Sequence, residues 1–357
     1  MKNKLIIITG ILLFTLIGCN EDNTPIDVPQ PSGAVLNAPV GGPAEPNQVW
    51  VDLDLKNIKV NQRDAWDFGF YNGDEFVVVL NTSILMAAGK TEFTDIDKVT
   101  ESDVTSLKSL VGVGTFQPGN MVYVDDIKGN YQERTAIEKI SSNDDENKVY
   151  LVNMGHFVYT GSSTDLMSVG DSRGWKKIRV LRNGTGGYKI QYADISDTTH
   201  QEISINKGSA DYDFTFLSLT KGIADIQPPK NQWDLCFTVF VNETKMGTDY
   251  TTYTYADFIT INSMNNTGAY QVMIPGDTES YDSFTKDNVD YSKFIYDDQR
   301  VIGGNWRTTP GGAKVYTDRF YVLKDNLGTL YKIRFLNMTN SQGHRGYPQF
   351  EYDVLLD

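Results

Sequence analysis

The amino-acid sequence predicts an all-β protein made of two similar antiparallel β-rich domains in tandem. Three observations lead to this fold class. Apolar and polar residues alternate along many short segments, turn-forming residues separate these segments, and elements of the first half recur in the second half.

Alternation with a period of two is typical of strands with one buried face. It predicts strands over 49–55, 75–80, 148–152, 177–181 and 188–192. The turn formers Asn72-Gly73 and Asn183-Gly184 precede two of them. Helical periodicity is confined to 104–111, so we expect one short helix there.

The internal repeat decides the domain organisation. Four segments recur in the same order at offsets of 155 to 171 residues: 63–70 as 230–237, 148–152 as 319–323, 175–181 as 330–336, and 188–194 as 347–353. This order predicts one β domain over 48–203 and a second over 204–357, separated in the polar stretch 194–213.

The first residues predict export and lipidation. Lys2 and Lys4 precede the apolar run 5–17, which is too short to remain as a transmembrane helix and is followed by Gly18 and Cys19. We interpret 1–18 as a lipoprotein signal peptide and expect a lipid thioether on Cys19, which would hold the protein at the outer membrane. An ordinary secretory signal is the alternative. The acidic residues directly after Cys19 resemble a surface-export signal.

Residues 19–47 hold six of the twelve prolines, so we expect a flexible tether that lies outside any core. If Cys19 carries lipid, Cys236 has no disulfide partner, and its apolar neighbours predict burial.

Charge and motifs narrow the function. A formal net charge of −14 disfavours nucleic acid as a partner, and the lipid anchor is the only membrane contact that we expect. The sequence contains neither a Gly-x-Ser-x-Gly nor a His-Glu-x-x-His motif, which favours a binding protein over an enzyme. The acidic run 144–146 suits either calcium or, more simply, a solvated hairpin turn.

The repeated elements resemble a known family. The Trp66-Asp67 and Trp233-Asp234 motifs, the Gly-Lys-Thr-Glu stretch 89–92 and the closing strands are similar to the HmuY-like haem-binding lipoproteins of Bacteroidota. The resemblance implies a protein that holds haem or a related porphyrin at the cell surface for iron acquisition and passes it to a TonB-dependent receptor.

From the residues alone, the same motifs have structural roles. We expect Asp67 and Asp234 to accept hydrogen bonds from local backbone amides. Lys177 and Arg179 are expected to face water from an alternating strand.

Haem iron needs an axial donor, which histidine or methionine can supply. His156, His200 and His344 do not fall in the loops where the family carries its ligands, so paired histidines are not expected. The candidate iron ligands are Met121 and Met167, both in loops.

Further methionines complete the set of candidate donors. Met154, at the end of a strand, is a third candidate contact for the cofactor. Met86, Met264 and Met273 are weaker candidates. For each methionine, packing in a core is the alternative.

A second reading of the function stays open. In it, the chain is a duplicated surface adhesion or carbohydrate-binding module without haem, and Trp50 and Trp306 supply an aromatic platform.

Overall fold

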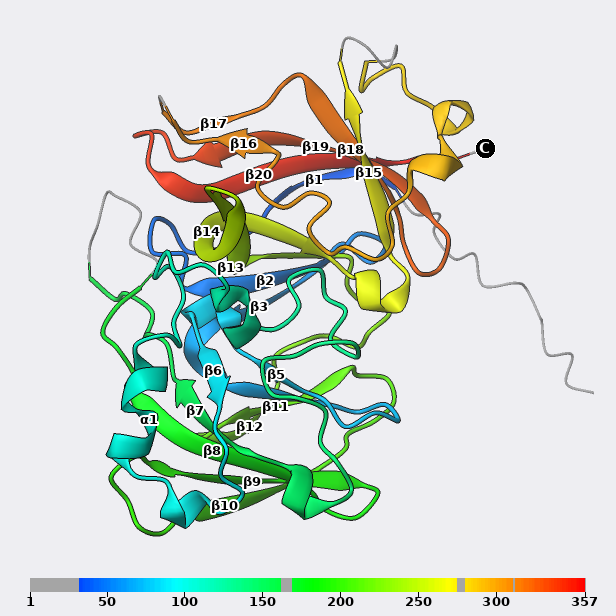
Figure 1. Cartoon of the computed structure of the whole chain (residues 1–357). Helices are drawn as coiled ribbons and strands as arrows, with labels where there is room; N and C mark the ends of the chain where they lie inside the picture. Colours follow the sequence, from blue (N-terminus) through cyan, green and yellow to red (C-terminus); the bar gives the residue numbers. More distant parts are fainter. Residues whose placement is uncertain (1–31, 162–168, 275–279, 311, 357) are drawn as a thin grey trace, which may run out of the picture. The chain divides into compact units, whose positions relative to one another are not determined.

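The computed structural model describes residues 32–161, 169–274, 280–310 and 312–356. Ser32–Asp357 forms one compact unit of four antiparallel sheets and a two-stranded ribbon (Figure 1). The predicted all-β class is confirmed.

Two five-stranded sheets have the same internal order. The first runs β1-β20-β19-β18-β15, with β1 (Ala34–Asn37), β20 (Arg345–Val354), β19 (Leu330–Thr339), β18 (Arg319–Lys324) and β15 (Gly268–Met273). The second runs β10-β9-β8-β7-β6, with β10 (Gln201–Asn206), β9 (Gly187–Asp194), β8 (Trp175–Arg182), β7 (Val149–Asn153) and β6 (Ala87–Lys90).

Two four-stranded sheets lie between them (Figure 1). One runs β14-β13-β2-β3, with β14 (Asp249–Ile261), β13 (Leu235–Met246), β2 (Asn47–Asp52) and β3 (Asn57–Gln62). The other runs β12-β11-β4-β5, with β12 (Gly222–Ala224), β11 (Phe214–Ser218), β4 (Phe68–Tyr71) and β5 (Val78–Leu80). The ribbon consists of β16 (Arg307–Thr308) and β17 (Lys314–Val315).

The helices are short. α1 (Glu101–Lys108) begins three residues before the predicted helix, and the backbone N–H of Thr100 donates to the Asp103 carboxylate at its start, 2.8 Å away. The 3₁₀ helices are η1 (Arg63–Ala65), η2 (Thr82–Ile84), η3 (Ile96–Lys98), η4 (Asn120–Tyr123), η5 (Asp144–Glu146), η6 (Ser263–Asn265), η7 (Lys286–Asn288) and η8 (Tyr291–Lys293).

Each inner sheet shares an apolar core with one outer sheet. Val49, Leu235 and Ile333 belong to the core between the sheets that contain β13 and β19. Phe68 and Ile178 belong to the corresponding core between the sheets of β4 and β8. A third cluster, which contains the motif residues Trp66 and Trp233, lies where the two inner sheets face each other.

The strand pairing crosses the domain boundary that the sequence predicted at 203/204. β13 pairs with β2, where Leu235 lies opposite Val51, and β11 pairs with β4, where Phe216 lies opposite Gly69. Each hairpin at the start of one predicted domain therefore completes the inner sheet of the other. The polar stretch 194–213 is also not a plain linker, because it contains β10, which pairs with β9.

The expected tether is wrong for residues 34–40. β1 pairs with β20, where Leu36 lies opposite Phe350, and the side chains of Ala38 and Val40 are 2% and 3% exposed in the first core. A stretch rich in proline can still supply an edge strand, because an edge strand needs hydrogen bonds along one side only. In the described part of the chain, no helix is long and apolar enough to cross a membrane.

Candidate functional site

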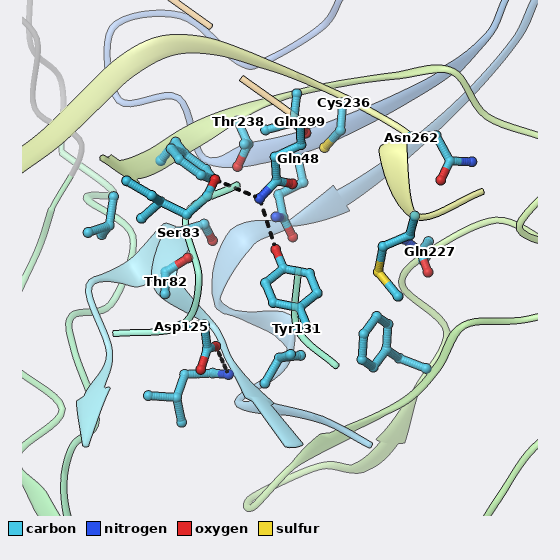
Figure 2. Close-up of a pocket in the computed structure, with 18 of the residues that line it drawn as sticks. Gln48, Thr82, Ser83, Asp125, Tyr131, Gln227, Cys236, Thr238, Asn262 and Gln299 are labelled. Atoms are coloured by element: carbon cyan, nitrogen blue, oxygen red, sulfur yellow. Dashed lines mark hydrogen bonds between the residues drawn. The ribbon is translucent and has the colours of Figure 1, made fainter. Parts of the chain in front are cut away.

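The best-formed pocket is a partly open cavity of about 110 Å³ between the two inner sheets. Figure 2 shows its lining, to which both sheets and the loop 124–131 contribute. We call it the inter-sheet cavity.

Strand alternation explains which side chains reach the inter-sheet cavity. In β2, Val49 and Val51 face the first core, so Trp50 between them faces the cavity. In β13, Cys236 faces the cavity in the same way, between Leu235 and Phe237. Both strands carry apolar residues on both faces because the sheet is covered on both sides.

Aromatic rings form the walls. The rings of Trp50 and Trp233 meet edge to face with centroids 4.8 Å apart, and Trp66 and Phe216 meet in the same way at 4.8 Å. The indole N–H of Trp66 donates to Gln48 Oε1 at 3.0 Å, so this tryptophan is fixed by a hydrogen bond as well as by packing.

Three polar atoms in the cavity lining lack a hydrogen-bond partner. These are Trp50 Nε1, Trp233 Nε1 and Gln227 Oε1, and their side chains belong to residues that are only 7% to 8% exposed. Buried polar atoms are nearly always hydrogen-bonded, because leaving one unpaired costs about 1–3 kcal/mol. Two donors and one acceptor of the cavity are thus available to a bound molecule.

A second polar group lies in the loop 124–131. The Asp125 carboxylate accepts the backbone N–H groups of Leu80 and Ala136 at 2.6 and 2.9 Å, and burial raises its pKa to about 7. The hydroxyl of Tyr131 accepts a hydrogen bond from Gln299 Nε2 at 3.1 Å (Figure 2). Burial raises the pKa of Tyr131 above its ordinary value.

Among the described residues that line the inter-sheet cavity, none is basic. Cys236 is buried, as predicted, and burial raises the pKa of its thiol, so the thiol stays protonated at neutral pH. The cavity is therefore aromatic and polar, without a positive charge to balance an anion.

The predicted methionine ligands do not come together in the described structure. Met121 lies in η4, partly buried against Val124 and Phe240. Met154 is 3% exposed in the core next to β7, packed with Ile84 among others, so its sulfur is enclosed. Met167 and Cys19 lie outside the described residues.

The weaker methionine candidates lie apart from one another. Met86 is fully buried in the second core. Met264 lines the inter-sheet cavity, and Met273 ends β15.

The histidines are occupied by other contacts. His156 Nδ1 lies 3.0 Å from the carbonyl of Gly170, and His200 Nδ1 lies 2.9 Å from the Asp97 carboxylate. His344 lies in the turn between β19 and β20. Across the described ranges, no group of three or more His, Cys, Asp or Glu side chains is placed to hold a metal ion.

Two other sequence hypotheses find structural explanations. The acidic run 144–146 forms the 3₁₀ turn η5, in which the Asn143 side chain accepts the N–H of Asp145 at 3.2 Å. Trp306 is 1% exposed and donates to the carbonyl of Asp257 at 3.0 Å, so it cannot serve as a surface platform.

The two Trp-Asp motifs hold the crossed hairpins in place. The Asp67 carboxylate accepts the backbone N–H of Leu219, and the Asp234 carboxylate accepts that of Leu53, both at 2.8 Å. The expectation of local amide partners is wrong, because these partners are 152 and 181 residues away. Each aspartate lies next to its distant amide because β13 pairs with β2 and β11 pairs with β4.

A haem group does not fit the inter-sheet cavity in this form. Pockets for molecules of drug size measure about 300–1,000 Å³, against about 110 Å³ here. The loop around Met121 suits haem better, because it combines a thioether with exposed apolar side chains. Phe116 is 49% and Val122 is 62% exposed, and Arg134 donates to the carbonyl of Met121 at 3.2 Å.

The fold and the cavity define a β-rich protein with an internal cavity, and family comparison agrees with the sequence. Residues 44–352 match the family described as HmuY protein. The chain belongs to the HmuY family.

Three solved structures are similar, all at low identity. A candidate lipoprotein from Bacteroides fragilis has 14% identity and a TM-score of 0.21, covering 51% of this chain and 90% of its own. The apo HmuY analog of Tannerella forsythia has 10% identity and a TM-score of 0.22, covering 91% and 96%. A candidate HmuY-like heme-binding protein from Bacteroides vulgatus has 8% identity and a TM-score of 0.21, covering 91% and 93%. No curated protein matches the chain.

The sequence draws attention to Trp50, Trp66, Trp233 and Cys236, but not to the polar residues of the cavity. Gln227, Asp125 and Tyr131 were not singled out, since no motif marks them. Trp50 is a sequence candidate for an aromatic platform, with burial in a strand as the commoner alternative, and the structure supports the alternative, since Trp50 is 8% exposed. The alternation within β2 carries the signal that its indole is buried between two sheets.

Proposed function

We propose that this protein binds haem or a related porphyrin at the bacterial surface. Membership of the HmuY family over residues 44–352 carries the proposal. The family resemblance also supports a role as a carrier rather than an enzyme. In this role the protein is lipidated at Cys19, is exposed on the outer membrane, and delivers its cargo to a TonB-dependent receptor for iron acquisition.

The loop around Met121 is the place in the described structure that we propose for the porphyrin. The Met121 thioether is a donor suited to haem iron, and the exposed ring of Phe116 is an apolar surface for a flat ligand. Arg134, whose side chain is 40% exposed and whose Nε lies 3.8 Å from the Asp126 carboxylate, would share its positive charge with a propionate. Bound haem would supply an iron centre for transport, and these residues would hold it. Met167 remains a second proposed donor.

The test is a titration of the purified protein with haemin, under oxidising and under reducing conditions, followed by the Soret band. We expect a shifted Soret band that saturates. A flat titration under both conditions would exclude the carrier and leave the adhesion or carbohydrate-binding reading.

Three matched variants then locate the iron donor. Met121→Leu, Met167→Leu and Met154→Leu each remove a thioether while nearly conserving volume. We expect Met121→Leu or Met167→Leu to change the spectrum. Met154→Leu is the control, because its sulfur is enclosed in the core. If only Met154→Leu changes the spectrum, the proposed location is wrong.

We also propose that the chain contains two copies of one β unit that exchange their first strands. Equivalent contacts in the two halves support this arrangement. Asn81 Nδ2 donates to the carbonyl of Trp66 at 2.8 Å, and Asn262 Nδ2 donates to that of Trp233 at 3.0 Å. Leu85 and Asn266, which follow them, both have left-handed backbones, with φ of 68° and 65°.

The exchanged arrangement can be tested with cysteine pairs. Leu235→Cys with Val51→Cys joins two strands that are paired in the structure. We expect a disulfide to form in this double variant within one chain. The control is Leu235→Cys with Leu217→Cys, because Leu217 lies opposite Phe68 on β4 in this structure and would lie opposite Leu235 only without the exchange. Crosslinking in the control alone would reject the exchange.

A further inference from the structure

The inter-sheet cavity has the properties of a binding site that the proposed haem function does not use. The cavity is too small for haem. It is also a separate place from the proposed haem site, because Met121 lies in η4 and does not line the cavity. We propose that this cavity binds a small neutral molecule that has a ring-sized apolar body and one hydroxyl group.

Size limits the apolar body. A cavity of roughly 150 Å³ lined by aliphatic and aromatic groups holds one benzene ring, and the inter-sheet cavity measures about 110 Å³. A single ring is thus the upper limit unless the sheets move apart. The edges and faces of Trp50, Trp66 and Trp233 are suitable walls for such a ring.

The unpaired polar atoms favour a group that both accepts and donates hydrogen bonds, and a hydroxyl is the smallest such group on a ring. The indole N–H groups of Trp50 and Trp233 need an acceptor, and Gln227 Oε1 needs a donor. A hydroxyl both accepts and donates, so one group can satisfy both needs. A purely apolar ligand would leave all three atoms unpaired, so the complex would keep the free-energy cost of three unsatisfied buried polar atoms.

Charge excludes ionic ligands. The lining has no Lys or Arg to balance an anion, and burying an unpaired charge is expensive. A cation would face two indole N–H groups of the same polarity. Two carboxylates line the cavity, and both already have partners. Asp125 accepts two backbone N–H groups, and Asp126 accepts the N–H of Lys128 at 2.8 Å and lies 3.8 Å from Arg134.

The test uses phenol as the probe and the tryptophan side chains as reporters. With the indole nitrogens labelled with ¹⁵N, phenol should shift the Nε1–H resonances of Trp50 and Trp233 in a saturable way. Trp306 is an internal control, because its N–H already donates to the carbonyl of Asp257, outside the cavity. Assignment follows from Trp50→Phe, Trp233→Phe and Trp306→Phe.

Two comparisons check the chemistry. Toluene has the same ring without the hydroxyl, and benzoate adds a charge; we expect both to bind more weakly than phenol. Gln227→Leu should weaken phenol binding about three- to tenfold, the effect of one hydrogen bond, and leave toluene binding unchanged.

Several outcomes would overturn the proposal. One is the absence of a saturable shift at Trp50 and Trp233, which would mean that the cavity holds only water. Equal shifts at Trp306, or equal affinity for toluene and phenol, would show nonspecific binding. Because a haemin titration is read from the Soret band and phenol from the indole resonances, failure of one proposal is distinct from failure of the other.

Discussion

The Asp234 carboxylate accepts the backbone N–H of Leu53 at 2.8 Å, across 181 residues of sequence. This contact fixes the hairpin β2–β3 to the strand β13, with which β2 pairs. Asp67 makes the equivalent contact to Leu219 in the other half, but only Asp67 has a cation beside it, Arg173 at 2.6 Å. The two aspartates should therefore respond in opposite ways when their charge is removed.

Asp234→Asn should make the protein more stable at alkaline pH. Burial raises the pKa of Asp234 from 3.8 to about 8, because the folded protein disfavours the carboxylate. The unfolded chain ionises freely, so folding stability falls as pH rises from about 4 through about 8. Asparagine keeps an acceptor for Leu53 without the charge. We expect a gain on the order of 1–3 kcal/mol at pH 9 and little change at pH 4, measured by urea unfolding.

Asp67→Asn should destabilise the protein. The side chains of Asp67 and Arg173 are 0% and 9% exposed, so the substitution leaves a buried guanidinium without its carboxylate. Removing one partner of a buried ion pair costs about 3–5 kcal/mol. The measurement is the free energy of unfolding in urea at pH 7, compared between Asp67→Asn and Asp234→Asn. Equal effects of the two substitutions would contradict this account.

Much of the fold could be predicted from local pattern. The ranges 177–181 and 188–192 fall on β8 and β9, because alternation repeats the polarity of a strand every two residues. The range 148–152 falls on β7, although β7 is buried on both faces. The choice of partners could not be predicted in this way. β2 and β11 offer similar edges, and nothing within either strand indicates which of β4 and β13 it joins.

The burial of individual polar groups also could not be predicted from the local sequence pattern. Lys177 was expected to face water, yet it is fully buried, and its ammonium donates to the carbonyls of Val99 and Asp197 at 2.9 and 2.6 Å. Those carbonyls come from loops whose positions depend on the tertiary fold. Lys332 repeats the arrangement in the other half, donating to the carbonyl of Tyr281 at 2.7 Å. The unpaired state of Gln227 Oε1 could not be predicted either, because it also depends on the tertiary fold.

Lys177→Met should destabilise the protein more than a substitution of its neighbour. Methionine fills the space of the aliphatic stem but leaves two carbonyls without their donor, at a cost of about 1–3 kcal/mol. The matched control is Lys176→Met on the same strand, whose ammonium contacts Asp194 at 2.7 Å near the surface. Such an exposed pair contributes at most about 1 kcal/mol. Thermal unfolding at neutral pH compares the two variants, and an equal loss would reject the buried role of Lys177.

Val40→Ala should destabilise the protein although it lies in the proline-rich stretch. Val40 is 3% exposed in the first core, so removing its two methyl groups leaves a cavity and costs roughly 1–3 kcal/mol. Val35→Ala, at a position 52% exposed on β1, is the matched control and should change stability by less than about 0.5 kcal/mol. The measurement is urea unfolding of both variants. If Val40→Ala unfolds at the same urea concentration as Val35→Ala, residues 34–40 behave as a tether after all, and the outer sheet must be stable without β1.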